Sequence, residues 1–274
     1  MQETVRFGIC QMPVAEDKEA NIIKARSMIE EAARNDSRLV ILPEMFNCPY
    51  RNSAFPEYAE TYPGGKTLAM LADAAREEQI FLVGGSIPEL SGGTIYNTSF
   101  IFGPRGELLG RHRKMHLFDV DLEGGLSFQE SATLGAGSQA TVIKTELGTL
   151  GVCICYDIRF PELSRLMVLR GAEIIIVPAA FNMTTGPAHW ELLLRARAVD
   201  NQVYVVGAAQ ATDETAGYTC YGHSAVINPW GQVVAEAGGQ ETILYGAIDF
   251  NLLEKTRREL PLLKHRRPGL YQGA

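Results

Sequence analysis

The sequence lacks the features of a secreted, membrane-bound or nucleic-acid-binding protein. Its first residues, Met1-Gln-Glu-Thr-Val-Arg6, have no apolar core of a signal peptide, and no apolar run approaches the length that spans a bilayer. The net charge of −7 leaves no excess of basic residues for nucleic acid or an anionic membrane surface. We therefore expect a cytoplasmic protein that has neither nucleic acid nor membrane as a partner.

Cysteine is sparse, and its spacing argues against metal binding. The five cysteines are an odd number with no metal-type spacing. Cys153 and Cys155 are separated by one residue, so on a strand their thiols would point to opposite faces. We expect a reduced, intracellular setting with no metal site, and we expect Cys153 to be a small core residue.

What the chain does contain is enough apolar sequence for a large core: 274 residues, of which 46% are hydrophobic. Strand and helix patterns alternate along it, and the two halves resemble each other faintly. Residues 38–44 (RLVILPE) match 173–180 (EIIIVPAA), 77–85 match 200–208, and 102–110 match 227–235. Chance similarity among common α/β patterns is the alternative.

We predict an α/β fold, a single domain over residues 1–274, with two mixed sheets and helices outside. The predicted helices are 21–33, 67–78, one that begins at Pro161, 189–199 and 252–259. The predicted strands are 5–11, 39–44, 80–87, 96–102, 107–114, 149–154, 173–178, 203–208, 222–227, one from residue 232 onward, and 242–248.

The stretch around Cys155 predicts a buried strand that ends at a cysteine and turns into a helix. Residues 149–154 are apolar and β-branched, and Pro161 suits the first turn of the following helix. A thiol at the carboxyl end of a strand lies where open α/β sheets bind ligands. The alternative is a buried cysteine that only fills space.

Two other strands also end in residues that could do chemistry. Glu44 follows a buried strand, where poor solvation would suit a carboxylate to move protons, although it could be an ordinary surface acid. Lys114 ends a strand within a basic run, in which we expect Arg111 and Arg113 to form a solvated basic edge. If the strand ends converge, Cys155 would be the nucleophile, Glu44 the base and Lys114 the oxyanion stabiliser.

Three motifs carry a resemblance to the nitrilase superfamily of carbon-nitrogen hydrolases: LPEMF, HRKMHLFD and CICYDIRFPEL. The similarity extends from FGICQM to HRRPGLY. It implies a four-layer α-β-β-α sandwich of two pseudo-symmetric halves, no cofactor, and a catalytic triad of Glu44, Lys114 and Cys155. It also implies a second glutamate, Glu130 in SFQES, whose alternative is a plain loop acid. The developing oxyanion would be held by Lys114 and by a backbone N–H, that of Tyr156.

Within the superfamily the chain is most similar to the ω-amidase branch, through FNCPYRNSAFPEYAE, HLFDVDLEGGLSFQES and FNMTTGPAHWELLLRARAVDNQVYV. Cys48 departs from the branch pattern, where a small residue such as serine is expected. The resemblance implies a linear amide substrate, the ω-amide of a short dicarboxylic acid such as α-ketoglutaramate, α-ketosuccinamate or succinamate, which is hydrolysed through a cysteine thioester. It also implies a homodimer. Arg159 would bind the distal carboxylate unless it pairs with Asp157 or Glu162. The further pocket residues that the resemblance implies, which could instead only pack, are Tyr50, His116, Phe181 and Thr185.

Other functions remain open at this stage. A papain-like protease needs a Cys–His pair and a local signature that the sequence around Cys155 does not match. A catalytically silent binding protein on the same fold would have lost one of the three triad residues, and all three are present. The nearer alternatives are deaminated-glutathione amidase, carbamoyl-amine hydrolase and nitrilase proper.

Overall fold

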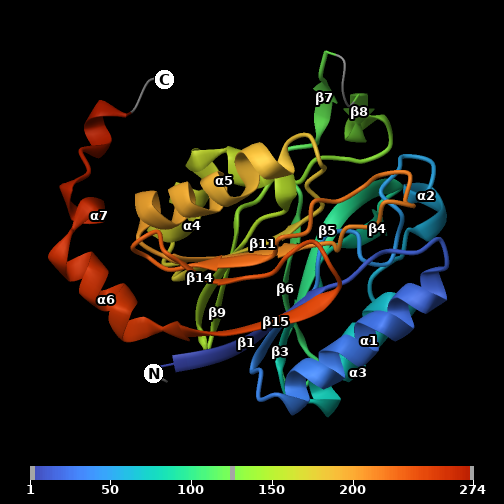
Figure 1. Cartoon of the computed structure of the whole chain (residues 1–274), viewed down its shortest axis with the longest axis horizontal. Coiled ribbons are helices and arrows are strands. Elements are labelled where there is room, and N and C mark those ends of the chain that lie inside the picture. Colours follow the sequence, from blue (N-terminus) through green and yellow to red (C-terminus); the bar gives the residue numbers. More distant parts are fainter. Residues whose placement is uncertain (1–3, 124–126, 272–274) are drawn as a thin grey trace.

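The computed structural model describes residues 4–123 and 127–271, and it places two β-sheets face to face between layers of helices (Figure 1). Strand side chains alternate between two apolar layers. Leu39 and Ile41 pack between the sheets with Leu150, whereas Val40 packs beneath the helices outside with Ile29. Strands buried on both faces explain the continuous apolar runs in the sequence. The predicted α-β-β-α sandwich is confirmed.

The first half of the chain builds a seven-stranded sheet with helices α1 (Lys18–Arg34) and α3 (Lys66–Glu77) on its outer face. Asp17 caps α1 by accepting the backbone N–H groups of Glu19 and Ala20, which would otherwise lack partners at the helix start. A short helix, α2 (Phe55–Tyr58), interrupts the long loop after β2. The strands run in the order β15, β1, β2, β3, β5 and β4, with β6 on β5: β1 (Thr4–Gln11), β2 (Leu39–Ile41), β3 (Phe81–Val83), β4 (Ile87–Ser91), β5 (Thr94–Phe102), β6 (Leu108–Arg113) and β15 (Thr242–Asp249).

The second half builds a six-stranded sheet beneath helices α4 (Pro161–Leu169) and α5 (Gly186–Asn201). Pro161 lies in the first turn of α4, as predicted. The strands, in sheet order, are β14 (Val233–Glu236), β13 (Ala225–Ile227), β12 (Tyr204–Ala209), β11 (Ile174–Ala179), β10 (Gly148–Val152) and β9 (Thr141–Thr145).

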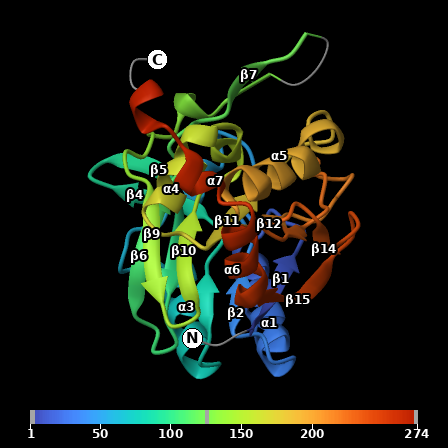
Figure 2. The same ribbon diagram turned by 90° about the vertical axis from the view of Figure 1, so that its left-hand side faces the viewer.

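The two halves share one strand pattern, which confirms the faint duplication. In the first half β1, β2 and β3 are parallel and β3 pairs antiparallel with β5; in the second, β10, β11 and β12 are parallel and β12 pairs antiparallel with β13. The last strand breaks the symmetry, because β15 leaves the second half and pairs with β1 over its full length. Helices α6 (Phe250–Glu259) and α7 (Leu262–His265) and the 3₁₀ turn η3 (Pro268–Leu270) then run along the outside (Figure 2).

The predicted strand over residues 80–87 was wrong, because the chain breaks into β3 and β4. Gly85 has a left-handed φ of +47°, and a Cβ there would lie 2.0 Å from the carbonyl oxygen of Pro43. Ser86 then accepts the backbone N–H of Met45 through its hydroxyl at 3.0 Å. The break therefore packs the chain tightly around the turn that carries Glu44.

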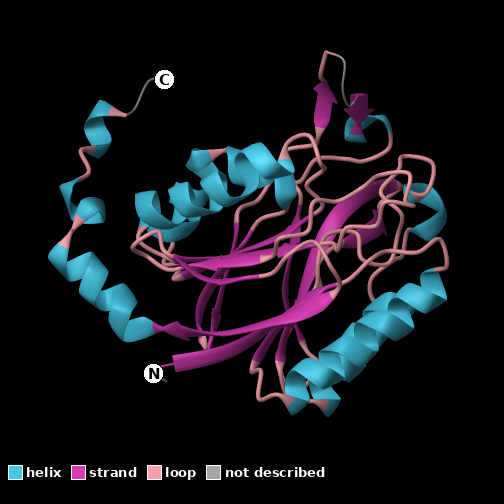
Figure 3. Cartoon of the chain, in the orientation of Figure 1, coloured by secondary structure: helices cyan, strands magenta, loops and turns pink. Residues whose placement is uncertain are grey.

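Three further elements differ from the prediction (Figure 3). The predicted strand 222–227 begins only at Ala225, because Gly222 and His223 both have positive φ and cannot join a ladder. The hairpin of β7 (Asp119–Asp121) and β8 (Ser127–Gln129), and strand β9, were not predicted. No helix in the described part of the chain is long and apolar enough to cross a bilayer.

Candidate active site

Cys155 lies at a strained turn between a strand and a short helix. Strand β10 ends at Val152, and the 3₁₀ helix η2 (Cys155–Arg159) begins with Cys155 at a left-handed φ of +47°. A non-glycine residue in this conformation costs about 1–3 kcal/mol and persists where surrounding contacts fix it. The first N–H groups of a helix have no acceptor within it, so the N–H of Tyr156 is available to a ligand. Cys153 is fully buried in the core, as predicted.

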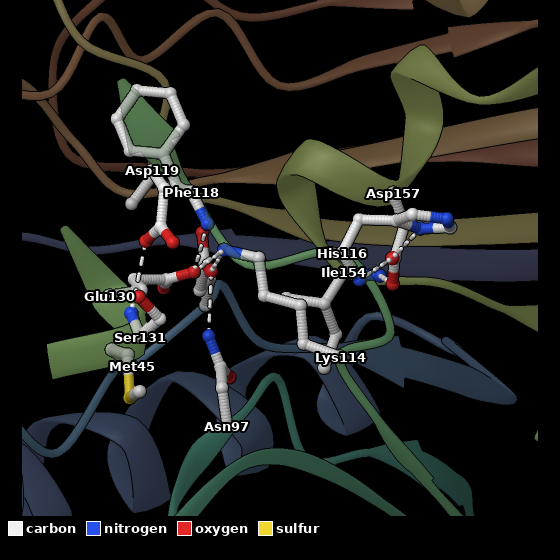
Figure 4. A network of polar contacts seen from close by, with 12 residues as sticks. Met45, Asn97, Lys114, His116, Phe118, Asp119, Glu130, Ser131, Ile154 and Asp157 are labelled. Atoms are coloured by element: carbon white, nitrogen blue, oxygen red, sulfur yellow. Dashed lines mark hydrogen bonds and ion pairs between the residues drawn. The ribbon is translucent and has the colours of Figure 1, made fainter. Parts of the chain in front are cut away.

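Glu44 and Lys114 form a buried pair in front of this turn. Glu44 lies three residues beyond β2, and Lys114 directly follows β6. The Lys114 Nζ is 2.9 Å from Glu44 Oε1, and both side chains are fully buried. Asn97 Nδ2 donates to the same oxygen at 2.8 Å (Figure 4). Glu44 Oε2 has no hydrogen-bond partner in the described structure, so this oxygen is free to accept a proton.

Glu130 is the second carboxylate on the lysine, and both of its oxygens are engaged. It begins the 3₁₀ turn η1 (Glu130–Ala132), and its Oε1 accepts hydrogen bonds from Tyr50 Oη at 2.7 Å and Lys114 Nζ at 3.0 Å. Its Oε2 accepts the backbone N–H of Phe118 at 2.6 Å. The two glutamates therefore differ in their hydrogen bonding. Glu44 has one oxygen that can exchange a proton, whereas both oxygens of Glu130 are engaged and one of them contacts Lys114.

The electrostatics of the site follow from burial and from these charges. Burial raises the pKa of Glu44, and the charge of Lys114 offsets this only in part. Burial raises the pKa of Cys155 well above its usual value, and Glu44 raises it further, against the opposing effect of Lys114. Burial alone would lower the pKa of Lys114, but the carboxylates of Glu130 and Glu44 raise it above its ordinary value. The raised pKa values favour an ammonium at Lys114 and a neutral thiol at Cys155, beside the carboxyl group of Glu44.

A small cavity opens onto the thiol. Its lining includes four of the predicted residues besides Cys155, namely Tyr156, Arg159, Phe181 and Thr185, and four that were not predicted, namely Phe118, Ala180, Asn182 and Tyr218.

Arg159 is the cation of this cavity. Its guanidinium lies 5.0 Å from the centre of the Phe181 ring, and its Nη1 is 3.2 Å from His189 Nδ1. No salt bridge joins it to a carboxylate of the described residues, so the alternative of a pair with Asp157 or Glu162 was wrong. The structure leaves a positive charge free to meet a ligand.

Two predicted pocket residues lie elsewhere. Tyr50 packs its ring 4.7 Å from that of Tyr218 and lines a second, outer groove, and its hydroxyl joins the Glu130 network. His116 is outside the cavity lining: its Nδ1 lies 2.7 Å from Asp157 Oδ1, and its ring stacks on Phe160. The prediction that His116 lines the pocket was wrong, because the buried Asp157 carboxylate takes its ring nitrogen.

Arg111 and Arg113 do not form the solvated basic edge that was predicted. Both donate to Glu89, at 2.7 Å from Arg111 Nη1 and 2.8 Å from Arg113 Nε, and the Glu89 side chain is only 1% exposed. On one face of β6, Arg111 and Arg113 thus both pair with the buried Glu89 carboxylate. The opposite face of the same strand leads to Lys114.

Sequence reasoning missed several polar residues that hold the site together. Asn97 lies within β5, and its signal was a polar side chain inside an apolar strand. Gln210 Nε2 donates to the backbone oxygen of Glu44 at 2.7 Å. Asn182 Oδ1 accepts the N–H groups of Thr184 and Thr185 and so shapes one cavity wall. The last two follow strands at loops whose sequence has no periodic pattern.

A thiol that lines a cavity lies close enough to a buried carboxyl group and a buried ammonium for both to shift its pKa, and these three groups are the set required for attack on a carbon–nitrogen bond. Residues 6–258 match the family model described as carbon-nitrogen hydrolase. The chain belongs to the carbon-nitrogen hydrolase family. It is an enzyme of the amidase type, so the alternative of a catalytically silent binding protein does not hold.

Similar proteins agree with this assignment over nearly the whole length. The omega-amidase NIT2 of Mus musculus is 49% identical over 268 residues, which cover 98% of this chain and 97% of that one. A chloroplastic omega-amidase of Arabidopsis thaliana is also 49% identical, over 97% of this chain and 73% of its own. The crystal structure of Saccharomyces cerevisiae Nit3, a member of branch 10 of the nitrilase superfamily, superposes with a TM-score of 0.90 at 43% identity, with 97% of each chain covered.

Proposed function

We propose that this chain hydrolyses the ω-amide of short dicarboxylic acid monoamides, of the α-ketoglutaramate, α-ketosuccinamate and succinamate type, to the dicarboxylate and ammonia. The observation that carries the proposal is that Cys155 and an unpaired Arg159 line the same small cavity. A guanidinium binds a carboxylate through two parallel hydrogen bonds, so it can hold the distal carboxylate while the amide faces the thiol. The ω-amidase names of the similar proteins support the same substrate class.

The first half-reaction forms a thioester. Glu44 Oε2 takes the thiol proton of Cys155, and the thiolate attacks the amide carbonyl carbon. Negative charge develops on the carbonyl oxygen, where the Lys114 ammonium and the N–H of Tyr156 stabilise it; one such donor contributes about 2.7–4 kcal/mol. Glu44 returns the proton to the amide nitrogen, the carbon–nitrogen bond breaks, and ammonia leaves.

The second half-reaction releases the acid. Glu44 takes a proton from water, the resulting hydroxide attacks the thioester carbonyl, and the carbon–sulfur bond breaks to regenerate the Cys155 thiolate, which Glu44 reprotonates. Glu130 takes no proton in this scheme, because both its oxygens are occupied. It keeps Lys114 aimed at the reacting oxygen through the 3.0 Å contact.

The test compares substrates that differ only in the distal group. Ammonia release is measured from α-ketoglutaramate, succinamate, butyramide and deaminated glutathione, with Cys155→Ala as the inactive control. Arg159→Gln is expected to raise KM for α-ketoglutaramate by about 100-fold, the effect of losing a bidentate charged contact, while butyramide hydrolysis stays nearly unchanged. Arg195→Gln, which removes an exposed arginine paired with Glu191, is the matched control.

Three results would contradict the proposal: a preference for deaminated glutathione, butyramide turnover that equals that of α-ketoglutaramate, or an Arg159→Gln enzyme with unchanged KM. Nitrile and carbamoyl-amine substrates complete the panel and separate the other branches of the superfamily.

A further inference from the structure

We propose that Asp157 is a positioning residue that holds the backbone beside Cys155 and the backbone beside Lys114 at a fixed separation, with His112 as its buried partner. The proposal rests on the proposed roles of Cys155 as nucleophile and Lys114 as oxyanion stabiliser. It assigns to Asp157 no contact with substrate. The carboxylate is fully buried and lies outside the cavity lining.

The contacts of Asp157 reach both sides of the site. Its Oδ2 accepts the backbone N–H of Ile154, the residue before Cys155, at 3.0 Å. Its Oδ1 accepts the backbone N–H of His116, two residues after Lys114, at 2.9 Å (Figure 4). One rigid carboxylate of three atoms therefore joins two segments. One is the turn at Cys155, which follows β10 of the second sheet, and the other is the stretch around Lys114, which follows β6 of the first sheet.

Among the described residues, the hydrogen bonds between the two segments all go to Asp157, and the other contacts are between rings, His116 with Phe160 and Phe118 with Tyr156. The Cys155 turn has a strained left-handed residue, and its backbone is closed by Asp157 itself, whose N–H donates to Ile154 O at 2.9 Å. The backbone of Lys114 bonds to Asn97 and Gly137, which belong to its own side of the site. Without the Asp157 carboxylate, each segment would keep its local structure but lose the hydrogen bonds that join it to the other segment.

His112 is the buried side-chain partner of this carboxylate. Its Nε2 lies 2.9 Å from Asp157 Oδ2, and both side chains are fully buried. Its Nδ1 lies 3.1 Å from Thr141 Oγ1, a hydroxyl whose proton is donated to the carbonyl oxygen of Arg111 at 3.2 Å. Both ring nitrogens of His112 therefore have polar partners. Burial alone would raise the pKa of Asp157, but the hydrogen bonds of His112 and His116 hold it well below its usual range.

A buried carboxylate could also serve stability alone, and the chain offers a matched comparison. Glu89 is equally buried and takes two cationic partners, Arg111 and Arg113, from β6, the strand that carries His112. Its hydrogen bonds do not reach the Cys155 turn. Glu89→Gln therefore disturbs a buried ion pair next to Lys114 without touching the link between the two segments.

The first experiment compares Asp157→Asn with Glu89→Gln. The amide of Asp157→Asn must present an N–H to one of the backbone donors, so one side of the link is lost. We expect kcat for α-ketoglutaramate to fall by about 100-fold with KM changed less than about threefold, since misplacement of reacting groups by about 1 Å costs this much. Glu89→Gln is expected to lower the thermal midpoint but keep kcat within about threefold of the wild type. Equal losses of kcat in the two variants, or an Asp157→Asn enzyme with wild-type kcat, would overturn the proposal.

A second readout is independent of amide turnover. The rate of Cys155 alkylation by iodoacetamide, followed by tandem mass spectrometry that separates Cys155 from Cys153, is expected to fall about tenfold in Asp157→Asn and to stay unchanged in Glu89→Gln. A wild-type enzyme that does not hydrolyse the amides would refute the proposed function, yet this comparison would still decide the role of Asp157. Unchanged alkylation in Asp157→Asn would refute the positioning role.

His112 provides the variant pair if Asp157→Asn does not fold. His112→Leu removes the donor to Asp157, and we expect kcat to fall about tenfold; His112→Gln keeps an N–H near the place of Nε2 and is expected to restore most of that loss. A wild-type kcat in His112→Leu, or equal kcat losses in the Leu and Gln variants, would contradict the role of His112 as partner.

Discussion

The Lys114 ammonium lies 2.9 Å from the Glu44 carboxylate in an ion pair that has no solvent access, with Glu130 3.0 Å away on the other side. One buried cation thus faces two buried carboxyl groups. Desolvation makes such charges costly, and a raised pKa at Glu44 is the visible sign of that cost. The proposed catalytic role of Glu44 and the stability of the fold therefore make opposite demands on this residue.

Glu44→Gln should separate the effect of this residue on stability from its effect on turnover. The raised pKa means that folding favours the protonated form of Glu44, so its contribution to stability is present at low pH and is lost as pH rises through the folded pKa. We expect the neutral amide to keep or raise the thermal midpoint at pH 7, by a few degrees for about 1 kcal/mol, while kcat falls at least about 1000-fold. Calorimetry beside a turnover assay measures both. A clearly lowered midpoint would show that the pair is net stabilising.

Lys114→Met should lower the stability of the fold, in contrast to Glu44→Gln. It leaves Glu44 and Glu130 buried without their cation, and breaking a buried pair in this way costs about 3–5 kcal/mol. Chemical denaturation is expected to show that loss together with the loss of activity. Lys144→Met changes an exposed lysine on β9 and is the control, with a change within about 0.5 kcal/mol. Similar values for the two variants would argue against the electrostatic account.

Tyr50→Phe tests whether turnover depends on the hydrogen bond that the Tyr50 hydroxyl donates to Glu130. The substitution removes the 2.7 Å hydrogen bond to Glu130 Oε1 and leaves the ring packed against Tyr218. We expect kcat to fall about tenfold, as expected for about 1.4 kcal/mol, with little change in KM. Tyr58→Phe loses a hydrogen bond to the backbone of Glu16, away from the site, and should leave kcat unchanged. Equal kcat in both variants would remove Tyr50 from the network.

Acid stability should depend on Asp157. Its folded pKa is depressed, so its contribution to stability is present above the unfolded value of about 3.9 and is lost as pH falls below it towards the folded value. The difference in the free energy of unfolding between wild type and Asp157→Asn should therefore be largest near neutral pH and shrink below about pH 4. Urea titrations from pH 7 to 3 measure it. A constant difference would mean that the carboxylate charge does not contribute.

The sequence predicted the elements whose pattern is repetitive and the residues that end them. Helix α1 has a clear apolar spacing, and the strands before Glu44 and Cys155 are continuous apolar runs, so all three elements could be found, although β2 ends at Ile41 and β10 at Val152, before their predicted ends. Strand β9 was missed because most of its residues are half-exposed and it has no strong alternation. Asn97 was missed for the opposite reason: its side chain points from a buried strand to a partner that only the tertiary fold brings close.

His116 shows where motif reasoning reaches its limit. It stands two residues from Lys114, and the resemblance to the ω-amidase branch implied that it lines the pocket. The structure turns it to Asp157, since a buried carboxylate accepts every donor within reach and this demand is not visible in the sequence. Arg111 was misjudged for the same reason, because its partner Glu89 lies 22 positions earlier in the chain.

The doubled architecture divides the reactive groups between two separately wound sheets. The proton acceptor and the ammonium belong to the first, and the thiol belongs to the second. A nascent chain or a proteolytic half therefore carries only part of the reactive set, and the first sheet also lacks its edge strand β15 until the end of the chain is present. Reactivity arises only when the two sheets dock, so turnover itself reports correct assembly, and a partly folded copy exposes no activated sulfur to the solutes around it.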